Sequence, residues 1–352
     1  MKDQRSYSMN RKQVNVIRLR RLIGDLPPVC VEYFRGIENK SSILTRINYA
    51  YDLRLFFNYL TQNIKEFKDK KAHLLDVSDL NLIKAVHIEM FLEYLTYYIK
   101  DDGSASVENN ESGKARKLSA IRSCFSFLFK RGYLVKNVAD LVDMPKINEK
   151  PIIRLDVDEV ANLLDIIEKG EGLTESQRKY HQLTKQRDLT LLTLFLGTGI
   201  RISECVGLNI DDFDFKNNSF KITRKGGNQE LLYFGDEVRK ALLDYIVERE
   251  KIIACPGHED AFFLSIQKKR LSNRAIQNIV KKYTKIVAPL KNISPHKLRS
   301  TFGTNLYRET GDIYLVADVL GHKDVNTTKK HYAAISDEKR RIAARIVKLR
   351  DD

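Results

Sequence analysis

The sequence predicts a mainly α-helical protein with two domains and a small antiparallel β-sheet in the C-terminal domain. Apolar residues recur at helical spacing along most of the chain, whereas residues 213–234 show the alternation and tight turns of strands. The length of 352 residues favours two domains with ample core. Two prolines and alternating charges in residues 144–151 discourage regular structure, so the linker is expected there.

The composition indicates a globular protein that binds a polyanion. The chain is 43% hydrophobic and 30% charged, and its net charge is +15. This charge is shared, with +8 in residues 1–150 and +7 in residues 151–352, as expected if both halves grip one duplex. A generic basic cytosolic protein or a membrane-surface binder could carry a similar charge. No basic amphipathic anchor stands out, so nucleic acid is favoured.

The expected location is the cytoplasm. The sequence has no run of 18 apolar residues that could span a membrane, and its polar N-terminus lacks the apolar core of a signal peptide. The four cysteines lie far apart and form no CxxC pair, so neither zinc nor a redox pair is indicated. Reduced thiols are typical of a cytoplasm.

The N-terminal half is predicted to comprise a basic arm, residues 1–22, and a helical domain, residues 23–145. The arm has seven Lys and Arg residues against one acidic residue, and such arms are usually disordered or loosely helical. Residues 101–113 are rich in Gly, Ser and Asn and predict a flexible loop. Apolar periodicity predicts three helices in the domain, beginning near Ser41 and covering Val86–Ile99 and Lys114–Lys130.

A linker over residues 146–155 is expected to lead into a C-terminal domain, residues 156–335. Asp156 is a suitable cap for the first helix of this domain. Residues 168–186 are polar and are predicted to form a surface insertion. The apolar helix that follows ends at Gly197-Thr198-Gly199, where the chain must turn sharply.

The predicted sheet has two turns, at Asn217-Asn218 and at Lys225-Gly226-Gly227-Asn228, so Lys225 lies at the tip of a hairpin. After a helix over Asp236–Lys251, residues 261–308 contain eleven Lys and Arg residues and no Asp or Glu. Surface helices normally mix charges, so the helix predicted over Ser272–Ile286 is expected to contact phosphates. The lysines proposed for these contacts are Lys281, Lys282 and Lys285.

The next helix is predicted to carry an anion-binding pair. Ser294 and Pro295 are a suitable N-cap and first helical residue. His296 and Arg299 then lie three residues apart, hence on one face. The guanidinium group of Arg299 offers a planar fork of donors that suits phosphate oxygens.

Two shorter helices are expected after this one. The first, Ile313 to about Leu320, stops at Gly321, which places His322 on the following turn. The second, residues 326–332, ends in Tyr332. Two histidines, an arginine and a tyrosine are thus predicted to converge from the ends of short helices.

This pattern, HxLRxxFxTxL followed by LGH and then Tyr332, resembles the second half of the signature of tyrosine recombinases, the phage integrase and Xer-type family. The first half is an arginine in a GxRxSE setting, which is present as Arg201 in the segment TGIRISE. Lys225 fits the basic β-turn residue between the halves. The resemblance covers residues 150–335 strongly and residues 40–150 weakly.

The resemblance implies that Tyr332 attacks the scissile phosphorus and forms a 3′-phosphotyrosine. A phenol with a pKa near 10 is only about 0.1% ionised at pH 7, so it needs a proton acceptor and cationic neighbours. Religation to another strand would complete recombination. No carboxylate cluster among the motif residues could hold Mg²⁺, so neither metal nor cofactor is expected.

The other motif residues would supply charge stabilisation and proton transfer. Arg201 and Arg299 would clamp the non-bridging phosphate oxygens. Lys225 would protonate the departing 5′-oxygen. The remaining implied roles are proton transfer for His296, a phosphate hydrogen bond for His322, and orientation of an arginine or histidine for Glu204.

The resemblance also implies a two-domain DNA clamp, nucleoid-associated, on double-stranded DNA with inverted-repeat half-sites. Four subunits would assemble, as a homotetramer or with a related recombinase. Residues 336–352 predict an amphipathic helix that packs on its own domain or on a neighbouring subunit. Basic residues at the start of the third helix would face the DNA: Lys114, Arg116 and Lys117.

Two other functions stay open from the sequence. The same constellation could relax supercoils as a type IB topoisomerase, or the fold could bind DNA without catalysis. The intact set of six motif positions argues against the second, and the helix after Tyr332 favours an assembling recombinase over the first. Chromosome dimer resolution and the movement of an integrative element are not separated.

Overall fold

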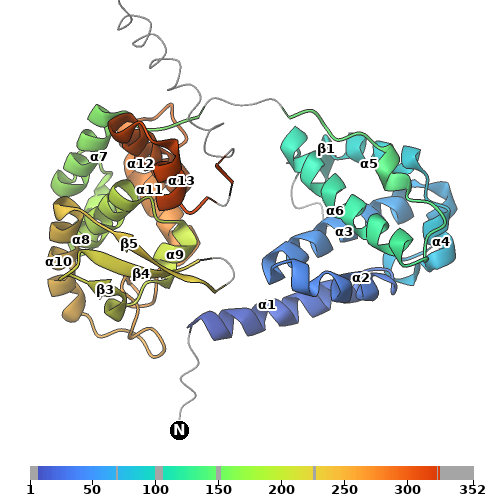
Figure 1. The fold of residues 1–352 in the computed structure, drawn as a ribbon, viewed down its shortest axis with the longest axis horizontal. Coiled ribbons are helices and arrows are strands. Elements are labelled where there is room, and N and C mark those ends of the chain that lie inside the picture. The colour runs from blue at the N-terminus through green and yellow to red at the C-terminus, as the bar shows by residue number, and fades with distance from the viewer. Residues whose placement is uncertain are drawn as a thin grey trace, which may run out of the picture. The chain divides into compact units, whose positions relative to one another are not determined.

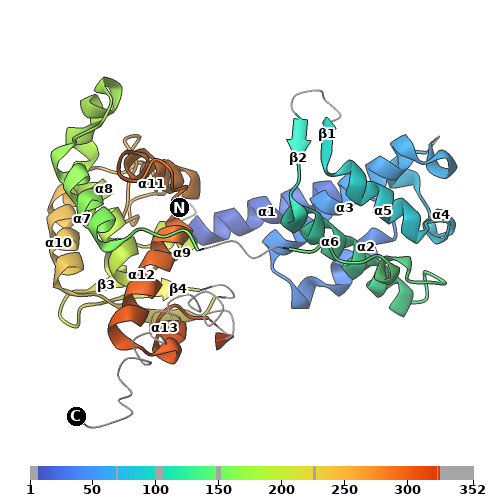
Figure 2. The same ribbon diagram turned by 90° about the horizontal axis from the view of Figure 1, so that it is seen from above.

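The computed structural model describes residues 7–68, 70–99, 106–147, 152–224, 227–322 and 324–325. The chain divides into two compact units, residues 1–150 and residues 151–352. Each unit is built mainly from helices and has a small antiparallel sheet (Figures 1 and 2), which confirms the predicted fold class. In the ranges given above, no helix combines the length and apolar character that a membrane span requires.

The first unit is organised around its third helix. Its helices are α1 (Tyr7–Gly24), α2 (Cys30–Gly36), α3 (Ile43–Asn63), α4 (Val77–Asn81), α5 (Ala85–Tyr94) and α6 (Glu111–Lys130). Ser42 caps α3 by accepting a hydrogen bond from the backbone of Thr45 at 3.2 Å. The helix then packs against α1, α5 and α6, and its Phe56 ring contacts Phe91 and Phe125 edge-on in the core.

The predicted N-terminal arm was wrong in its extent. Helix α1 packs on α3, and its side chains Leu19 and Leu22 are buried in the core of the unit. Arg18 donates a hydrogen bond to the Tyr51 hydroxyl at 2.8 Å, which adds a second tie. The charge of residues 1–22 concealed these apolar positions, which lie three residues apart on one face of the helix. Residues 1–6 lie outside the described part of the chain.

A short hairpin replaces the end of one predicted helix. Helix α5 ends at Tyr94, and β1 (Tyr97–Ile99) pairs antiparallel with β2 (Ser106–Glu108). Residues 101–113 are therefore not a single flexible loop, since β2 and the first turn of α6 fall within them. The β-branched and aromatic residues at 97–99 suit a strand better than a helix end.

The second unit is built around α8. Its helices are α7 (Val157–Lys169), α8 (Glu175–Thr198), α9 (Ile202–Gly207), α10 (Asp236–Glu250), α11 (Asn273–Val287), α12 (Pro295–Thr310) and α13 (Ile313–Val319). Helix α8 packs against α7, α10 and α12. It begins at Glu175 because Thr174 and Gln177 form a capping box, so the predicted surface insertion ends at residue 174 and not at 186.

The sheet of this unit has three strands in the order of the chain. They are β3 (Phe213–Asp214), β4 (Ser219–Thr223) and β5 (Gln229–Tyr233), all antiparallel. Strand β4 lies beside α9 (Figure 1), with Phe220 and Ile222 buried on its inner face. The β4–β5 hairpin therefore reaches the same region as the start of α9.

Candidate active site

The chain turns sharply between α8 and α9, and this turn positions Arg201. Helix α8 ends at Thr198 and is capped by Gly199, whose φ of 61° is left-handed. A Cβ atom at position 199 would come within 2.5 Å of the Phe302 ring, so glycine is required for space as well as conformation. Arg201 then caps α9, and its backbone N–H donates to the Glu204 carboxylate at 2.9 Å.

The side chain of Arg201 connects Glu204 to the end of α13. Its Nη1 donates to Glu204 Oε1 at 2.9 Å, and Glu204 is buried. Its Nη2 donates to the backbone carbonyls of Leu320 at 3.1 Å and Gly321 at 3.0 Å. The Arg201 side chain remains 35% exposed, so this guanidinium group can reach a ligand from solvent.

Helix α12 delivers Arg299 to the same place. Arg299 is buried, and its guanidinium group donates to the carbonyls of Gly199 and Leu320. These two bonds join α12 to the end of α8 and the end of α13. His296 lies one turn earlier on α12, as the three-residue spacing predicts, and its side chain is exposed.

The end of α13 is shaped by Gly321 and His322. The N–H of His322 donates to Ala317 O at 2.8 Å, and the N–H of Gly321 donates to Asp318 O at 2.7 Å. With a φ of 58° at Gly321, this is a Schellman ending. The carbonyls of a helix end have no partner within the helix, so that of Leu320 can accept bonds from elsewhere. His322 is half-buried on the turn, where it was predicted.

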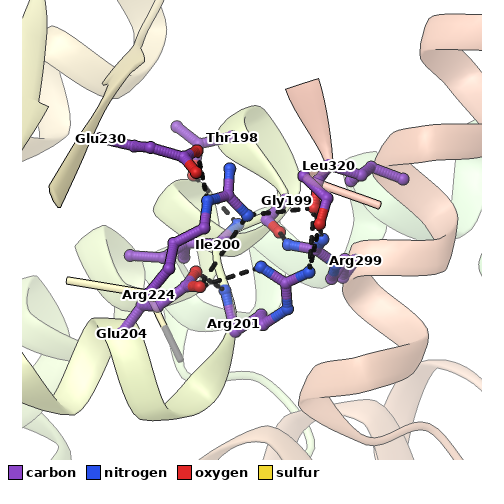
Figure 3. Close-up of polar contacts among 10 residues, drawn as sticks. Thr198, Gly199, Ile200, Arg201, Glu204, Arg224, Glu230, Arg299 and Leu320 are labelled. Atoms are coloured by element: carbon purple, nitrogen blue, oxygen red, sulfur yellow. Dashed lines mark hydrogen bonds and ion pairs between the residues drawn. The ribbon is translucent and has the colours of Figure 1, made fainter. Parts of the chain in front are cut away.

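Three guanidinium groups converge on the Leu320 carbonyl (Figure 3). Besides Arg201 and Arg299, the third is Arg224, whose Nη1 donates to Leu320 O at 3.2 Å. Arg224 follows β4, and its Nε also donates to Glu230 on β5. Arg224 is not one of the motif residues predicted from the sequence, where its place beside Lys225 is its one distinguishing feature.

Two predicted catalytic residues, Lys225 and Tyr332, lie outside the described residues, as does the predicted C-terminal helix. Within the described part, four segments supply the cluster: the α8–α9 turn, the end of β4, α12 and the end of α13. Three arginines face two carboxylates, Glu204 and Glu230. The arrangement suits an anion with several oxygen acceptors, such as a phosphate.

Among the basic residues predicted to contact DNA from α6, Lys117 is misassigned. It is only 7% exposed, and its amine donates to Asn109 Oδ1 at 2.6 Å. Burial lowers the pKa of this amine, which is the opposite of what a phosphate partner would do. Arg116 is ion-paired with the buried Asp52, and Lys114 lies 3.1 Å from Glu111.

Helix α11 presents two of its three predicted lysines to solvent. Lys281 and Lys285 are exposed. Lys282 is instead held 2.8 Å from Asp188, a fully buried carboxylate, and lies over the Tyr283 ring at 4.0 Å from its centroid. The Tyr283 hydroxyl also donates to Asp188 at 2.9 Å. Lys282 is therefore paired inside the unit, and the prediction that it contacts phosphate is wrong.

Comparison with known proteins places these motifs in one family. Residues 154–339 match the model of the phage integrase family. Tyrosine recombinase XerC of Caldanaerobacter subterraneus subsp. tengcongensis is 30% identical over 350 residues, covering 96% of this chain and 91% of the relative. Tyrosine recombinase XerD of Corynebacterium glutamicum is 29% identical over 307 residues, covering 87% and 93% respectively.

A solved structure shows the same fold. The XerH site-specific recombinase, bound to its palindromic difH substrate in a post-cleavage complex, matches with a TM-score of 0.64 at 21% identity. The match covers 87% of this chain and 80% of that one.

Proposed function

This chain belongs to the phage integrase family and is a tyrosine recombinase, and on that premise we propose that it cuts and rejoins double-stranded DNA through a 3′-phosphotyrosine at Tyr332. The alternatives that the sequence left open, a type IB topoisomerase and a non-catalytic DNA-binding protein, are not favoured, because the relatives named above are recombinases. The observation that carries the proposal is the convergence of Arg201 and Arg299 on one carbonyl oxygen.

The arginine cluster supports a role in phosphate binding. Arg201 and Arg299 come from helices that are far apart in sequence, yet both donate to Leu320 O. A scissile phosphate beside them would gain charge-assisted hydrogen bonds to its non-bridging oxygens, and these strengthen as charge develops in the transition state. Glu204 holds Arg201 in place by accepting one hydrogen bond from its guanidinium group and one from its backbone N–H.

The remaining roles follow from the order of the motif. Tyr332 attacks phosphorus, and Lys225 protonates the 5′-oxygen that departs. His296 takes part in proton transfer, and His322 donates to the phosphate. The exposure of His296 and the position of His322 on the α13 turn are compatible with these roles.

Neither metal nor cofactor is needed in the proposed mechanism, because arginines and a lysine supply the positive charge. Cleavage should therefore continue in EDTA. Loss of cleavage in EDTA with recovery in Mg²⁺, at unchanged DNA binding, would contradict this part of the proposal.

The proposed partner is duplex DNA with inverted-repeat half-sites, held by both units as a clamp. Proposed phosphate contacts come from Lys114 and Arg116 in the first unit and from Lys281 and Lys285 in the second. Four subunits, identical or shared with a related recombinase, would exchange strands between two duplexes. Residues 336–352 would dock on a neighbouring subunit, so their deletion should abolish synapsis while leaving a folded protein that binds single sites.

The decisive test is Tyr332→Phe on a nicked suicide substrate, from which the cleaved strand end diffuses away. The wild type should accumulate a covalent protein–DNA adduct on a denaturing gel, and the variant should bind the DNA and form none, because the phenolic oxygen is the attacking atom. Tyr314→Phe is the matched control, since Tyr314 is an exposed tyrosine on α13. An adduct of undiminished yield from Tyr332→Phe would refute the assignment.

A further inference from the structure

Arg224 shares its acceptors with the two arginines of the motif. Its Nη1 donates to Leu320 O at 3.2 Å, and this oxygen also accepts bonds from Arg201 and Arg299 (Figure 3). The same nitrogen lies 3.9 Å from Glu204 Oε1, which accepts a bond from Arg201 at 2.9 Å. Arg224 is therefore joined to the cluster by two contacts, although it is not a motif residue.

The guanidinium group of Arg224 keeps donor capacity for a ligand. Its Nε donates to Glu230, whose side chain is 45% exposed, and its Nη1 donates to Leu320 O. Within the described residues these two nitrogens make the side-chain hydrogen bonds of Arg224, and its Nη2 makes none. The Leu320 oxygen has two lone pairs and is shared by three guanidinium groups, so it cannot satisfy all of them by itself. An anion with several oxygens would supply further acceptors.

The low exposure of Arg224 is compatible with anion binding. Its side chain is 10% exposed, and Arg299, for which a phosphate contact is proposed above, is buried as well. A hydrogen bond to a charged group is stronger where water is excluded. A shielded guanidinium group at this place therefore suits an oxyanion that enters the cluster.

Gly321 makes room for this guanidinium group. A Cβ atom at position 321 would lie 2.0 Å from Arg224 Nη1 and 2.2 Å from its Cζ. Any side chain at this position would displace the guanidinium group from the cluster. The glycine therefore serves the arginine contact as well as the left-handed conformation of the α13 ending.

We propose that Arg224 is a third anion-binding arginine, which contacts a non-bridging oxygen of the scissile phosphate together with Arg201 and Arg299. This rests on the proposed function, in which that phosphate lies at the cluster. In the cleavage step the phenolic oxygen of the nucleophile loses its proton and forms a bond to phosphorus. The bond from phosphorus to the 5′-oxygen breaks, and that oxygen takes up a proton. Negative charge on the non-bridging oxygens grows in the transition state, so a third cation lowers the barrier.

The test measures binding with two duplexes, one with the ordinary phosphate and one with an uncharged methylphosphonate at the position where the wild type cleaves. The methyl group replaces one non-bridging oxygen and removes the negative charge. In a Tyr332→Phe background, which is proposed not to cleave, the phosphate duplex should bind more tightly. Arg224→Gln should shrink the ratio of the two dissociation constants about 10-fold, at a melting temperature near that of the parent. An unchanged ratio would overturn the proposed contact.

Glu230→Gln separates anion binding from a structural tie between Arg224 and β5. This variant removes the carboxylate that accepts the Arg224 Nε bond and leaves the arginine itself in place. The ratio of dissociation constants should therefore stay at or above that of the parent. A ratio that falls as far as in Arg224→Gln would show that the tie to Glu230 is what matters, and would overturn the proposal. Arg224→Lys, which keeps the charge, should retain part of the ratio.

A further variant displaces Arg224 without removing it. Gly321→Ala should lower the ratio as Arg224→Gln does, because the new Cβ occupies the place of the guanidinium group. Gly257→Ala is the matched control, since Gly257 has a φ of 83° and nothing within 4 Å of an added Cβ. It imposes similar backbone strain away from the cluster and should leave the ratio unchanged. Equal ratios in the two glycine variants would contradict the proposal.

Arg201→Gln, measured alongside, distinguishes failure of this proposal from failure of the proposed function. If Arg201→Gln lowers the ratio and Arg224→Gln does not, the contact from Arg224 is overturned and the phosphate site stands. If neither variant lowers it, the cluster is not the phosphate site, and the proposed function loses the observation that carries it. A lower ratio in both variants supports the two assignments together.

Discussion

Two arginine sites in the second unit differ in how guanidinium groups are matched to backbone carbonyls. Arg249 is buried, and this one guanidinium group donates to three backbone carbonyls: Glu259 at 2.6 Å, Ala261 at 2.9 Å and Ile252 at 3.1 Å. At Leu320 the ratio is reversed, because three guanidinium groups donate to one carbonyl oxygen. Arg249 joins a loop to its own helix, whereas the Leu320 cluster gathers charge.

The two sites differ in exposure and in charge, since the Arg201 side chain is 35% exposed whereas Arg249 is buried. A carbonyl oxygen has two lone pairs, so Leu320 O cannot satisfy three cationic forks by itself. The carbonyls of Gly199 and Gly321 accept further bonds from Arg299 and Arg201, but they carry no charge. Even with Glu204 and Glu230 included, the cluster holds more positive than negative groups. The donors of Arg249, in contrast, are occupied by three backbone carbonyls of the protein itself. The number and kind of acceptors, not the presence of arginine, distinguish a structural contact from an anion site.

The largest expected effect is on Arg201→Lys, which tests the cluster directly. Lysine keeps the charge but loses the fork that contacts Glu204 and Leu320 together. Single-turnover cleavage of the suicide substrate should fall about 100- to 1,000-fold, with little change in folding. Arg249→Lys, assayed at a temperature where it is folded, should cleave within about threefold of wild type. An equal loss of cleavage rate in Arg201→Lys and Arg249→Lys would contradict the proposed difference between the Leu320 cluster and Arg249.

Truncation of Arg249 should lower the stability of the protein, because this arginine has a structural role. Arg249→Met leaves three carbonyl acceptors, one of them buried and two partly buried, without their donor, so the free energy of unfolding should fall by about 2–4 kcal/mol. Urea unfolding of the full chain, monitored by circular dichroism, measures this. Arg201→Lys should change the same quantity by less than about 1 kcal/mol. A stable Arg249→Met protein would mean that the carbonyls find water instead.

The lysines of α11 also differ in whether they are paired within the protein or exposed, and this difference should decide which of them bind DNA. Lys281→Gln with Lys285→Gln should flatten the plot of log K against log salt by up to about 0.9 for each lost phosphate contact. Lys282→Gln is the control, because its amine is already paired with Asp188. That variant should keep the slope and lose stability. A slope unchanged by the double variant would assign Lys281 and Lys285 to a solvated surface.

The smallest effect is expected at Asp52, the carboxylate that binds Arg116. Burial raises the pKa of Asp52 above its ordinary value of 3.8 despite the lowering effect of Arg116. The folded state therefore binds this proton more tightly, and the Asp52 contribution to stability falls as the pH rises above 3.8. Asp52→Asn removes that trend.

At pH 7, Asp52→Asn should unfold within about 1 kcal/mol of wild type, because half-exposed Arg116 gains water when it loses its partner. Relative to wild type, the variant should gain stability as the pH is raised from 4 to 7, measured by urea unfolding at several pH values. If the variant instead loses stability relative to wild type as the pH is raised from 4 to 7, the ion pair with Arg116 outweighs the burial of Asp52.

Much of the fold could be predicted because it is encoded locally. Caps such as Ser42, Asp156 and Ser272 begin helices where the sequence indicates, and Gly321 ends α13. Helix α1 was missed because its charged residues outnumber the two leucines that anchor it. Partners distant in sequence were also missed, since nothing local indicates that Asp52 would bind a residue 64 positions later.

The candidate site could be predicted only as far as its side chains form a motif. Arg201 and Arg299 meet in the structure, and a motif that joins distant segments indicated both. The atom on which they meet is a backbone oxygen of Leu320, which no pattern of residue types can reveal. Arg224 was missed for the same reason, because its importance depends on contacts with that oxygen and with Gly321.

The Leu320 carbonyl also sets an order of assembly during synthesis, because the arginines that it gathers are made before it. The bonds to this oxygen come from residues 119, 96 and 21 positions earlier in the chain. A nascent polypeptide can therefore fold its first unit, and most of its second, before the oxygen that gathers the arginines has left the ribosome. The arginine cluster can therefore assemble only after residue 320 has left the ribosome, although its three arginines are made earlier.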